Sequence, residues 1–122
     1  MKFRTLLAAA AALTVMTPAI AAAKTQIQWW HAMGGALGQK LESIVANYNK
    51  SQDKYEVVPT YKGSYPETMT AAIAAFRAHQ QPDIVQVYEV GTGTMMAAKG
   101  AVYPVYQLMK DTGEPVNPKD YL

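Results

Sequence analysis

Three short β-like runs alternate with stretches of helical periodicity, and this order restricts the fold more than any other feature of the 122-residue chain. The runs begin near Thr25, Tyr55 and Asp83. The stretches between them are too long for hairpin loops, and helical connections of that length join parallel strands through right-handed crossovers. The sequence therefore predicts an α/β fold with a mostly parallel sheet and flanking helices.

The first run and the helix after it follow from residue spacing. Residues 25–30 are rich in β-formers and Gly34-Gly35 follow as a breaker, so the first strand should end near Trp30. Apolar residues then recur at the spacing of one helix face: Leu37, Leu41, Ile44, Val45 and Tyr48. This pattern predicts an amphipathic helix of about three turns that ends in residues 49–51.

The second run, residues 55–61, contains Pro59, which places its far end at a strand terminus or at a sheet edge. Ser64-Tyr65-Pro66-Glu67 then has the S-x-x-E form of a helix capping box, with proline in the first turn. A second helix should follow and end before Gln81-Pro82. Its apolar face is predicted to contain Met69, Ala72, Ile73 and Phe76.

The third run, residues 83–88, is almost continuously apolar, which predicts a strand buried on both faces of a parallel sheet. Glu89 stands where that strand should emerge. Residues 91–94 read Gly-Thr-Gly-Thr and predict a loop, followed by a short helix over 95–99 that Gly100 caps. Residues 102–109 are ambiguous, although Pro104 favours a loop and then one helical turn.

The N-terminus has the features of a secretory leader. Lys2 and Arg4 precede an apolar stretch over residues 6–20, and small residues lead to Ala23, after which cleavage is expected. A membrane anchor is the alternative, but it needs about 20 apolar residues, and Pro18 and two threonines interrupt this shorter stretch. Residues 1–23 are therefore predicted to be a signal peptide, and the absence of cysteine leaves no lipid tether there.

Export through such a leader, without a tether, predicts a location in the periplasm of a Gram-negative bacterium. Without Lys2 and Arg4, nine basic residues balance nine acidic ones, so the net charge of +2 does not describe the mature part. The remaining basic residues form no stripe that could follow a phosphate backbone. We therefore expect no nucleic-acid partner.

The ends of parallel strands share one edge of a sheet, which is where open α/β folds bind small ligands. Glu89 is the best candidate to accept hydrogen bonds from ligand hydroxyls, and its alternative is an exposed carboxylate at a strand end. Tyr65 could face the same edge from the start of a capped helix, and its alternative is a surface tyrosine or a hydrophobic staple. Trp30 and His31 are similarly placed, but such residues more often belong to the core or the scaffold.

Enzyme motifs are absent from the sequence. His31 and His79 match no metal-binding spacing, and there is no G-x-S-x-G nucleophile motif. Gly34-Gly35 and residues 91–94 could let an anion approach a helix N-terminus, but the full G-x-G-x-x-G spacing fails at Met96. These observations favour a binding protein without a metal or cofactor over an enzyme.

Four stretches resemble the periplasmic glycerol-3-phosphate-binding family of bacterial ABC importers. The resemblance covers essentially the whole chain after the leader, and the second and fourth stretches are the most particular. The stretches are Trp30-His31-x-Met33-x-Gly35-x-Leu37-Gly38, Val58-Pro59-Thr60-Tyr61-Lys62-Gly63-x-Tyr65, Ala74-Ala75-Phe76-Arg77, and Gln86-Val87-Tyr88-Glu89-Val90-Gly91-Thr92-x-Thr94-Met95-Met96-Ala97. The first alone would indicate only the broader extracellular solute-binding family, which also takes maltose.

This resemblance implies a two-lobed, type II periplasmic-binding fold, in which residues 24–122 are the start of the N-terminal lobe of a longer protein. It implies a monomer that closes around sn-glycerol 3-phosphate, or a glycerophosphodiester such as glycerophosphocholine. The ligand would pass to membrane permease subunits driven by cytoplasmic ATPase subunits. Tyr65 and Glu89 match ligand-contacting residues of the family motifs, whereas its phosphate contacts come from later parts of the chain.

Two other functions stay open from the residues themselves. A sugar-binding relative of the same family would share the fold and the aromatic edge. A secreted enzyme acting on glycerophosphodiesters would need a metal-ligand cluster further along the chain.

Overall fold

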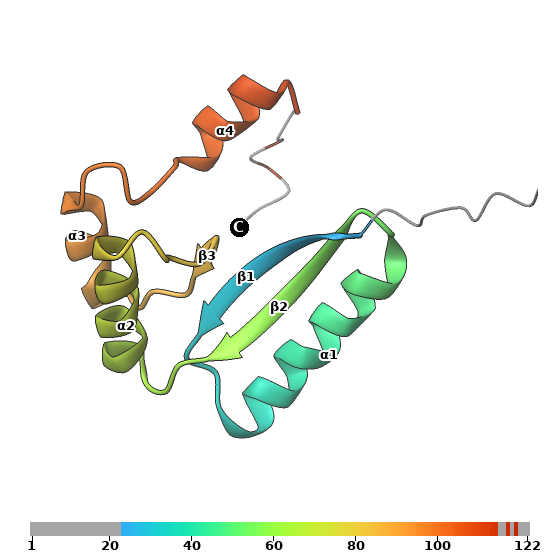
Figure 1. The fold of residues 1–122 in the computed structure, drawn as a ribbon, viewed down its shortest axis with the longest axis horizontal. Coiled ribbons are helices and arrows are strands. Elements are labelled where there is room, and N and C mark those ends of the chain that lie inside the picture. The colour runs from blue at the N-terminus through green and yellow to red at the C-terminus, as the bar shows by residue number, and fades with distance from the viewer. Residues whose placement is uncertain (1–22, 115–116, 118, 120–122) are drawn as a thin grey trace, which may run out of the picture.

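A parallel sheet of three strands organises the part of the chain that the computed structural model describes, which is residues 23–114, 117 and 119 (Figure 1). The strands are β1 (Thr25–His31), β2 (Tyr55–Tyr61) and β3 (Ile84–Val85), and their order in the sheet is β2-β1-β3. β1 and β2 pair over their full lengths, from Thr25 opposite Tyr55 to His31 opposite Tyr61. The predicted α/β fold with a parallel sheet is confirmed.

Helix α1 (Gly35–Ser51) connects β1 to β2 and is longer than predicted, at 17 residues. It lies along the two strands in Figure 1 and buries Gly38, Leu41 and Val45. Gly38 permits a close approach, because a Cβ there would lie 2.7 Å from the Met33 carbonyl oxygen. Of the five apolar residues predicted for this face, three remain exposed: Leu37, Ile44 and Tyr48.

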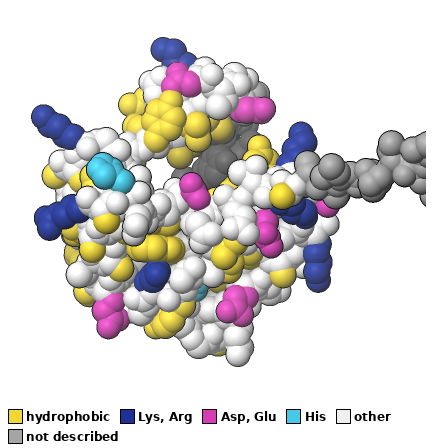
Figure 2. Space-filling model, in the orientation of Figure 1, with side chains coloured by type: hydrophobic (Ala, Val, Ile, Leu, Met, Phe, Trp, Pro, Cys, Tyr) yellow, Lys and Arg dark blue, Asp and Glu magenta, His cyan; other side chains and the backbone are white. Residues whose placement is uncertain are grey.

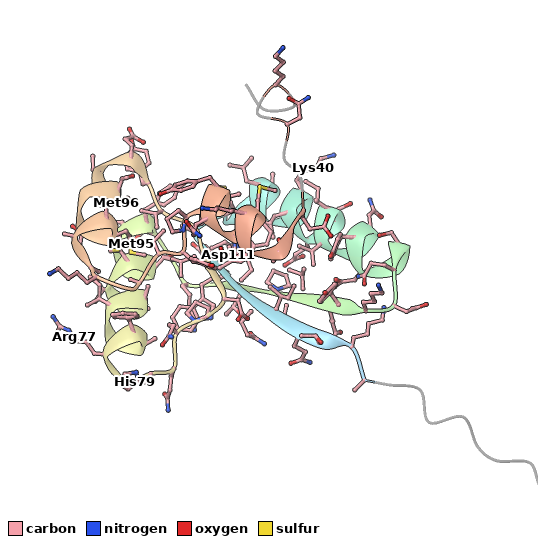
Figure 3. The ribbon with its side chains drawn as sticks, turned by 90° about the horizontal axis from the view of Figure 1, so that it is seen from above. Lys40, Arg77, His79, Met95, Met96 and Asp111 are labelled. Atoms are coloured by element: carbon pink, nitrogen blue, oxygen red, sulfur yellow. The ribbon has the colours of Figure 1, made fainter. Side chains whose placement is uncertain are left out.

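Helix α2 (Tyr65–Arg77) begins with the predicted capping box. The Glu67 carboxylate accepts a hydrogen bond from the Ser64 backbone N–H at 2.6 Å and another from the Ser64 hydroxyl at 2.7 Å. The helix ends before Gln81-Pro82, as expected, and His79 follows it with a φ of 56°. Figure 3 shows Arg77 and His79 at this end of α2, away from the sheet.

The third strand differs from its prediction, since only Ile84 and Val85 pair with β1, opposite Trp29 and Trp30. The expected burial on both faces is wrong as well, because Ile84 is 47% exposed. On either side of this short strand, side chains accept hydrogen bonds from backbone N–H groups of the neighbouring segment. The Asp83 carboxylate accepts from the Gln28 N–H at 2.8 Å, and the Gln86 side-chain oxygen accepts from the Ala32 N–H at 3.0 Å.

Helix α3 (Glu89–Ala97) corrects a second prediction, because residues 91–94 lie inside it and form no loop. The physical reason is packing at Gly91. A Cβ there would lie 2.6 Å from the Met69 Cε atom and 3.0 Å from Val87 Cγ1, so the missing side chain lets α3 approach α2. The helix also ends before the predicted residue 99, and Gly100 follows with a left-handed φ of 78°.

Helix α4 (Val105–Thr112) resolves the ambiguous stretch as a helix that starts directly after Pro104. Figure 1 shows it at the end of an extended connection, and Figure 2 shows apolar side chains exposed over it. Its exposed apolar residues include Val105, Tyr106 and Leu108. The Tyr103 hydroxyl donates a hydrogen bond to the Asp111 carboxylate, which raises the pKa of Tyr103 above its ordinary value.

The predicted signal peptide falls almost entirely outside the described residues. Within residues 23–114, 117 and 119, no helix is both long enough and apolar enough to cross a membrane.

Candidate functional site

The two predicted ligand-contacting residues stand at equivalent places in the fold. Tyr65 is the first residue of α2, the helix that follows β2, and Glu89 is the first residue of α3, the helix that follows β3. Because the strands are parallel, both helices start at the edge of the sheet where the strands end. The parallel topology thus places both residues at one edge.

Tyr88 connects these two residues. Its ring centroid lies 5.1 Å from that of Tyr65, with 35° between the ring planes. A hydrogen bond from its hydroxyl to the Glu89 carboxylate raises the pKa of Tyr88 above its ordinary value, and burial and the nearby Tyr65 add to the rise. The structure therefore brings Tyr65, Tyr88 and Glu89 together, and we call these three residues the Tyr88 cluster.

Gln86 joins the cluster from the end of β3, and the sequence analysis did not single it out. Its side-chain amide donates to the Tyr65 hydroxyl oxygen at 3.5 Å, while its side-chain oxygen accepts from the Ala32 N–H. The signal in the sequence was a lone polar residue inside an apolar run. Such a residue needs hydrogen-bond partners when it is buried, and here the partners are at the edge of the sheet where the strands end.

His31 has a structural role. It is 3% exposed, its Nδ1 atom accepts from the Met33 N–H at 3.3 Å, and its ring lies 6.0 Å from those of Trp29 and Tyr61. Trp30 lies under the Lys62 ammonium, which is 4.0 Å from the ring centroid and forms a cation–π contact. Through these contacts both residues help to hold the end of β1 in place.

The helix N-termini at this edge are poorly suited to anions. Glu67 lies in the first turn of α2 and Glu89 in that of α3, and each carboxylate offsets the positive end of the helix dipole. The predicted anion loop at residues 91–94 is part of α3. Of the two candidate anion positions, Gly34-Gly35 alone lie where a helix begins, since Gly34 is the N-cap of α1 and Gly35 its first residue, and α1 has no acidic residue in its first turn.

The described residues leave the Tyr88 cluster open. Tyr88 is 44% exposed and Glu89 is exposed. A shallow depression of about 410 Å³ runs along α2, but its described lining residues are Pro66, Glu67, Thr70, Ala71 and Ala74 and include no member of the cluster. Nor do three or more potential metal-ligating side chains gather anywhere in this part of the chain. The cluster offers hydroxyl and carboxylate groups that suit a hydroxyl-bearing ligand.

No family model matches the chain, but it is similar to several curated proteins. It is 47% identical over 116 residues to the sn-glycerol-3-phosphate-binding periplasmic protein UgpB of Agrobacterium fabrum, an overlap covering 95% of this chain and 27% of the relative. It is 48% identical over 102 residues to the protein of the same name from Rhizobium meliloti, covering 84% of this chain and 24% of the relative. The Yersinia pestis protein of that name is 53% identical over 100 residues, covering 82% of this chain and 23% of the relative.

These overlaps cover most of this chain but only about a quarter of each relative's length. They include the segments that carry the Tyr88 cluster, since an overlap of 95% leaves out only a few residues of the chain. The chain is therefore similar over most of its length to sn-glycerol-3-phosphate-binding periplasmic proteins, and it spans about a quarter of their length.

Proposed function

We propose that the protein containing this chain is the periplasmic substrate-binding component of a bacterial ABC importer for sn-glycerol 3-phosphate. The observation that carries the proposal is an identity of 47% over 95% of this chain with a protein named for binding that ligand. The Tyr88 cluster supports it, because its carboxylate and hydroxyl groups can hold the glycerol part of such a ligand.

In this proposal the glycerol hydroxyls bind at the Tyr88 cluster. Glu89 accepts hydrogen bonds from them, and a charge-assisted bond of this kind contributes about 1.5–3 kcal/mol. The resemblance to the family implies that the phosphate contacts come from parts of the protein outside this chain. Among the helices that start at this edge, α2 and α3 have a carboxylate in the first turn, whereas α1 has none.

The proposed mechanism is closure of two lobes around the ligand. Contacts from both lobes favour the closed state in proportion to the difference in affinity between the open and closed states. The closed monomer would then deliver its ligand to permease subunits, with ATPase subunits on the cytoplasmic side. A glycerophosphodiester such as glycerophosphocholine fits the same scheme, since it keeps the glycerol hydroxyls.

A binding test with full-length protein separates the candidate ligands. Isothermal titration calorimetry with sn-glycerol 3-phosphate, glycerophosphocholine, glycerol, inorganic phosphate and maltose should give tight binding of the first, or of the first two. Glycerol and inorganic phosphate should each bind far more weakly, because each can make only the contacts of one part of sn-glycerol 3-phosphate. Binding of maltose without binding of sn-glycerol 3-phosphate would reject the proposal in favour of a sugar-binding protein.

The fragment of residues 24–122 offers a second test. In the two-lobe account it should not bind sn-glycerol 3-phosphate measurably, because it supplies one side of the site. Hydrolysis of glycerophosphocholine by the full-length protein would instead indicate a secreted enzyme, although the relatives above are named as binding proteins.

The proposed signal peptide of residues 1–23 belongs to the same scheme. Its support from the structure is that β1 begins at Thr25, two residues after the expected cleavage point. N-terminal sequencing of the protein from a periplasmic extract should begin at Lys24. Recovery of the uncleaved protein in the membrane fraction would favour an anchor.

A further inference from the structure

We propose that Gln86 is a positioning residue that fixes the direction of hydrogen bonding at Tyr65, so that the Tyr65 hydroxyl donates to the ligand. This inference rests on the proposed function, because it assigns a role to a residue of the same binding site. It starts from the two hydrogen bonds of the Gln86 side chain, to Ala32 and to Tyr65.

The main chain at Gln86 is held in place. Its backbone N–H donates to the Trp30 carbonyl at 2.9 Å, directly after the short pairing of β3 with β1. The side chain is partly buried and extends along the edge of the sheet between Ala32 and Tyr65. A partly buried amide without partners would be costly, and both ends of this one are satisfied.

The orientation of the amide follows from chemistry. A backbone N–H can only donate, so the Gln86 atom 3.0 Å from the Ala32 nitrogen must be the side-chain oxygen. The side-chain nitrogen therefore faces the Tyr65 hydroxyl, at 3.5 Å. This argument fixes which way the amide points without any need to observe hydrogens.

The consequence concerns the Tyr65 hydrogen. An amide nitrogen can only donate, so the Tyr65 oxygen is the acceptor and the hydroxyl hydrogen points elsewhere. The Glu89 carboxylate, by contrast, has oxygens that can only accept hydrogen bonds when it is ionised. Glu89 keeps lone pairs that can accept from a ligand hydroxyl.

The cluster therefore presents a donor at Tyr65 and an acceptor at Glu89, each at the start of a helix at the same edge of the sheet. This pair suits a polyol that offers a hydroxyl hydrogen to Glu89 and a second oxygen to Tyr65. A neighbouring hydroxyl or ester oxygen of a glycerol derivative meets that requirement. Gln86 takes no part in binding itself and acts only through the hydroxyl of Tyr65.

The test is a double-mutant cycle in the full-length protein with sn-glycerol 3-phosphate. Gln86→Glu keeps the size of the side chain and the acceptor for Ala32 but removes the donor, and the new carboxylate takes the Tyr65 hydrogen. It should raise Kd about tenfold through loss of this hydrogen bond, beyond any effect of its charge. In the Tyr65→Phe background that extra tenfold loss should vanish.

Controls separate positioning from charge and from folding. Gln81→Glu places the same charge at an exposed position and should change Kd less than about twofold. An equal rise of Kd caused by Gln86→Glu in the wild-type and Tyr65→Phe backgrounds would show that Gln86 does not act through Tyr65. That result would overturn the proposal while leaving the ligand assignment intact.

A measurement without ligand keeps the two proposals apart. The side-chain amide signals of Gln86 in a ¹⁵N–¹H NMR spectrum, assigned by their loss in Gln86→Glu, should shift in Tyr65→Phe. Unchanged signals would overturn the contact. If the wild-type protein binds maltose and not sn-glycerol 3-phosphate, the proposed function fails, and the same cycle with maltose still decides the role of Gln86.

Discussion

Asn49 pairs with the backbone of Val57 through two hydrogen bonds. Its side-chain nitrogen donates to the Val57 carbonyl at 2.9 Å, and the Val57 N–H donates to its side-chain oxygen at 2.8 Å. Val57 lies in β2, which is an edge strand among the described residues. The amide of Asn49, in the last turn of α1, thus acts as an added peptide group that covers part of a free strand edge.

Replacing this amide should destabilise the protein. Asn49→Ala leaves a donor and an acceptor of Val57 without their partners, and we expect the free energy of unfolding to fall by about 1–3 kcal/mol. Urea denaturation of the full-length protein measures it. The matched control is Asn47→Ala, an exposed position in the same helix, which should change stability by less than about 0.5 kcal/mol. Equal losses in the two variants would contradict this role of Asn49.

Lys24 closes the same end of α1. Its ammonium donates to the carbonyl oxygens of Asn49 at 3.0 Å and Gln52 at 2.8 Å, where the helix dipole is negative. It also lies 3.4 Å from the carboxylate of Asp53, which is fully exposed and adds little.

Lys24→Met should therefore lower the free energy of unfolding by about 0.5–2 kcal/mol, because two helix-end carbonyls lose a charged donor. Thermal unfolding of the full-length protein checks this. Lys40→Met is the control, since Lys40 projects from the exposed face of α1 (Figure 3). If raising the salt concentration removed the whole effect of Lys24→Met, the exposed pair with Asp53 and not the helix end would be responsible.

The capping box at Glu67 predicts a dependence of stability on pH. The hydrogen bond from the Ser64 backbone, and then that from the Ser64 hydroxyl, lower the pKa of Glu67 from its ordinary 4.5. A lowered pKa in the folded state means that the stabilisation is present above pH 4.5 and is lost as the pH falls through the lower folded value.

Glu67→Gln should accordingly melt below the wild type at pH 7, with a difference that shrinks as the pH is lowered below 4.5. The wild type loses the ionised carboxylate over that range, whereas the variant has none to lose. Thermal unfolding followed by circular dichroism at several pH values measures the difference. A difference that stays constant from pH 7 downward would mean that the charge of Glu67 contributes nothing.

Glu89→Gln should weaken ligand binding without unfolding the protein. The loss of one charged hydrogen bond corresponds to about 1.5–3 kcal/mol, or a rise in Kd of roughly ten- to a hundredfold. Calorimetry on the full-length protein measures it, with Glu42→Gln, exposed on α1, as the control. Unaltered affinity in Glu89→Gln would show that this residue does not bind the ligand.

The same variant has a readout that needs no ligand. The hydrogen bond to Glu89 is the largest cause of the raised pKa of Tyr88. Glu89→Gln should therefore lower the pKa of Tyr88, which a spectrophotometric titration of the tyrosines can detect when Tyr88→Phe identifies its signal.

Features that depend on neighbouring residues could be predicted from the sequence. The capping box between Ser64 and Glu67 spans one helical turn, so its spacing alone specifies it. The parallel sheet followed from the lengths of the connections, and with it the location of Tyr65 and Glu89 at one edge. Pro59 indicated either a strand terminus or a sheet edge, and β2 is an edge strand among the described residues.

Features that depend on contacts between distant segments could not be predicted in this way. The apolar run at residues 83–88 was expected to be one strand, but only Ile84 and Val85 pair with β1. Outside them the remaining hydrogen bonds come from the side chains of Asp83 and Gln86 and from the Gln86 backbone N–H. The Gly-Thr-Gly-Thr stretch was expected to be a loop, but Gly91 packs against Met69 inside a helix. The sequence spacing around Gly91 does not show that a Cβ there would meet the Met69 side chain, which comes from α2.

By itself the sequence determined the class of fold, the order of its elements and the edge at which ligand-contacting residues could gather, because periodicity and connection length are local properties. Only the tertiary structure decided that Tyr88 joins Tyr65 to Glu89 and that Gln86 sets the direction of the hydrogen bond at Tyr65. Hydrogen-bond direction depends on which groups meet in space, and no spacing along the chain specifies that the amide of Gln86 lies between Ala32 and Tyr65.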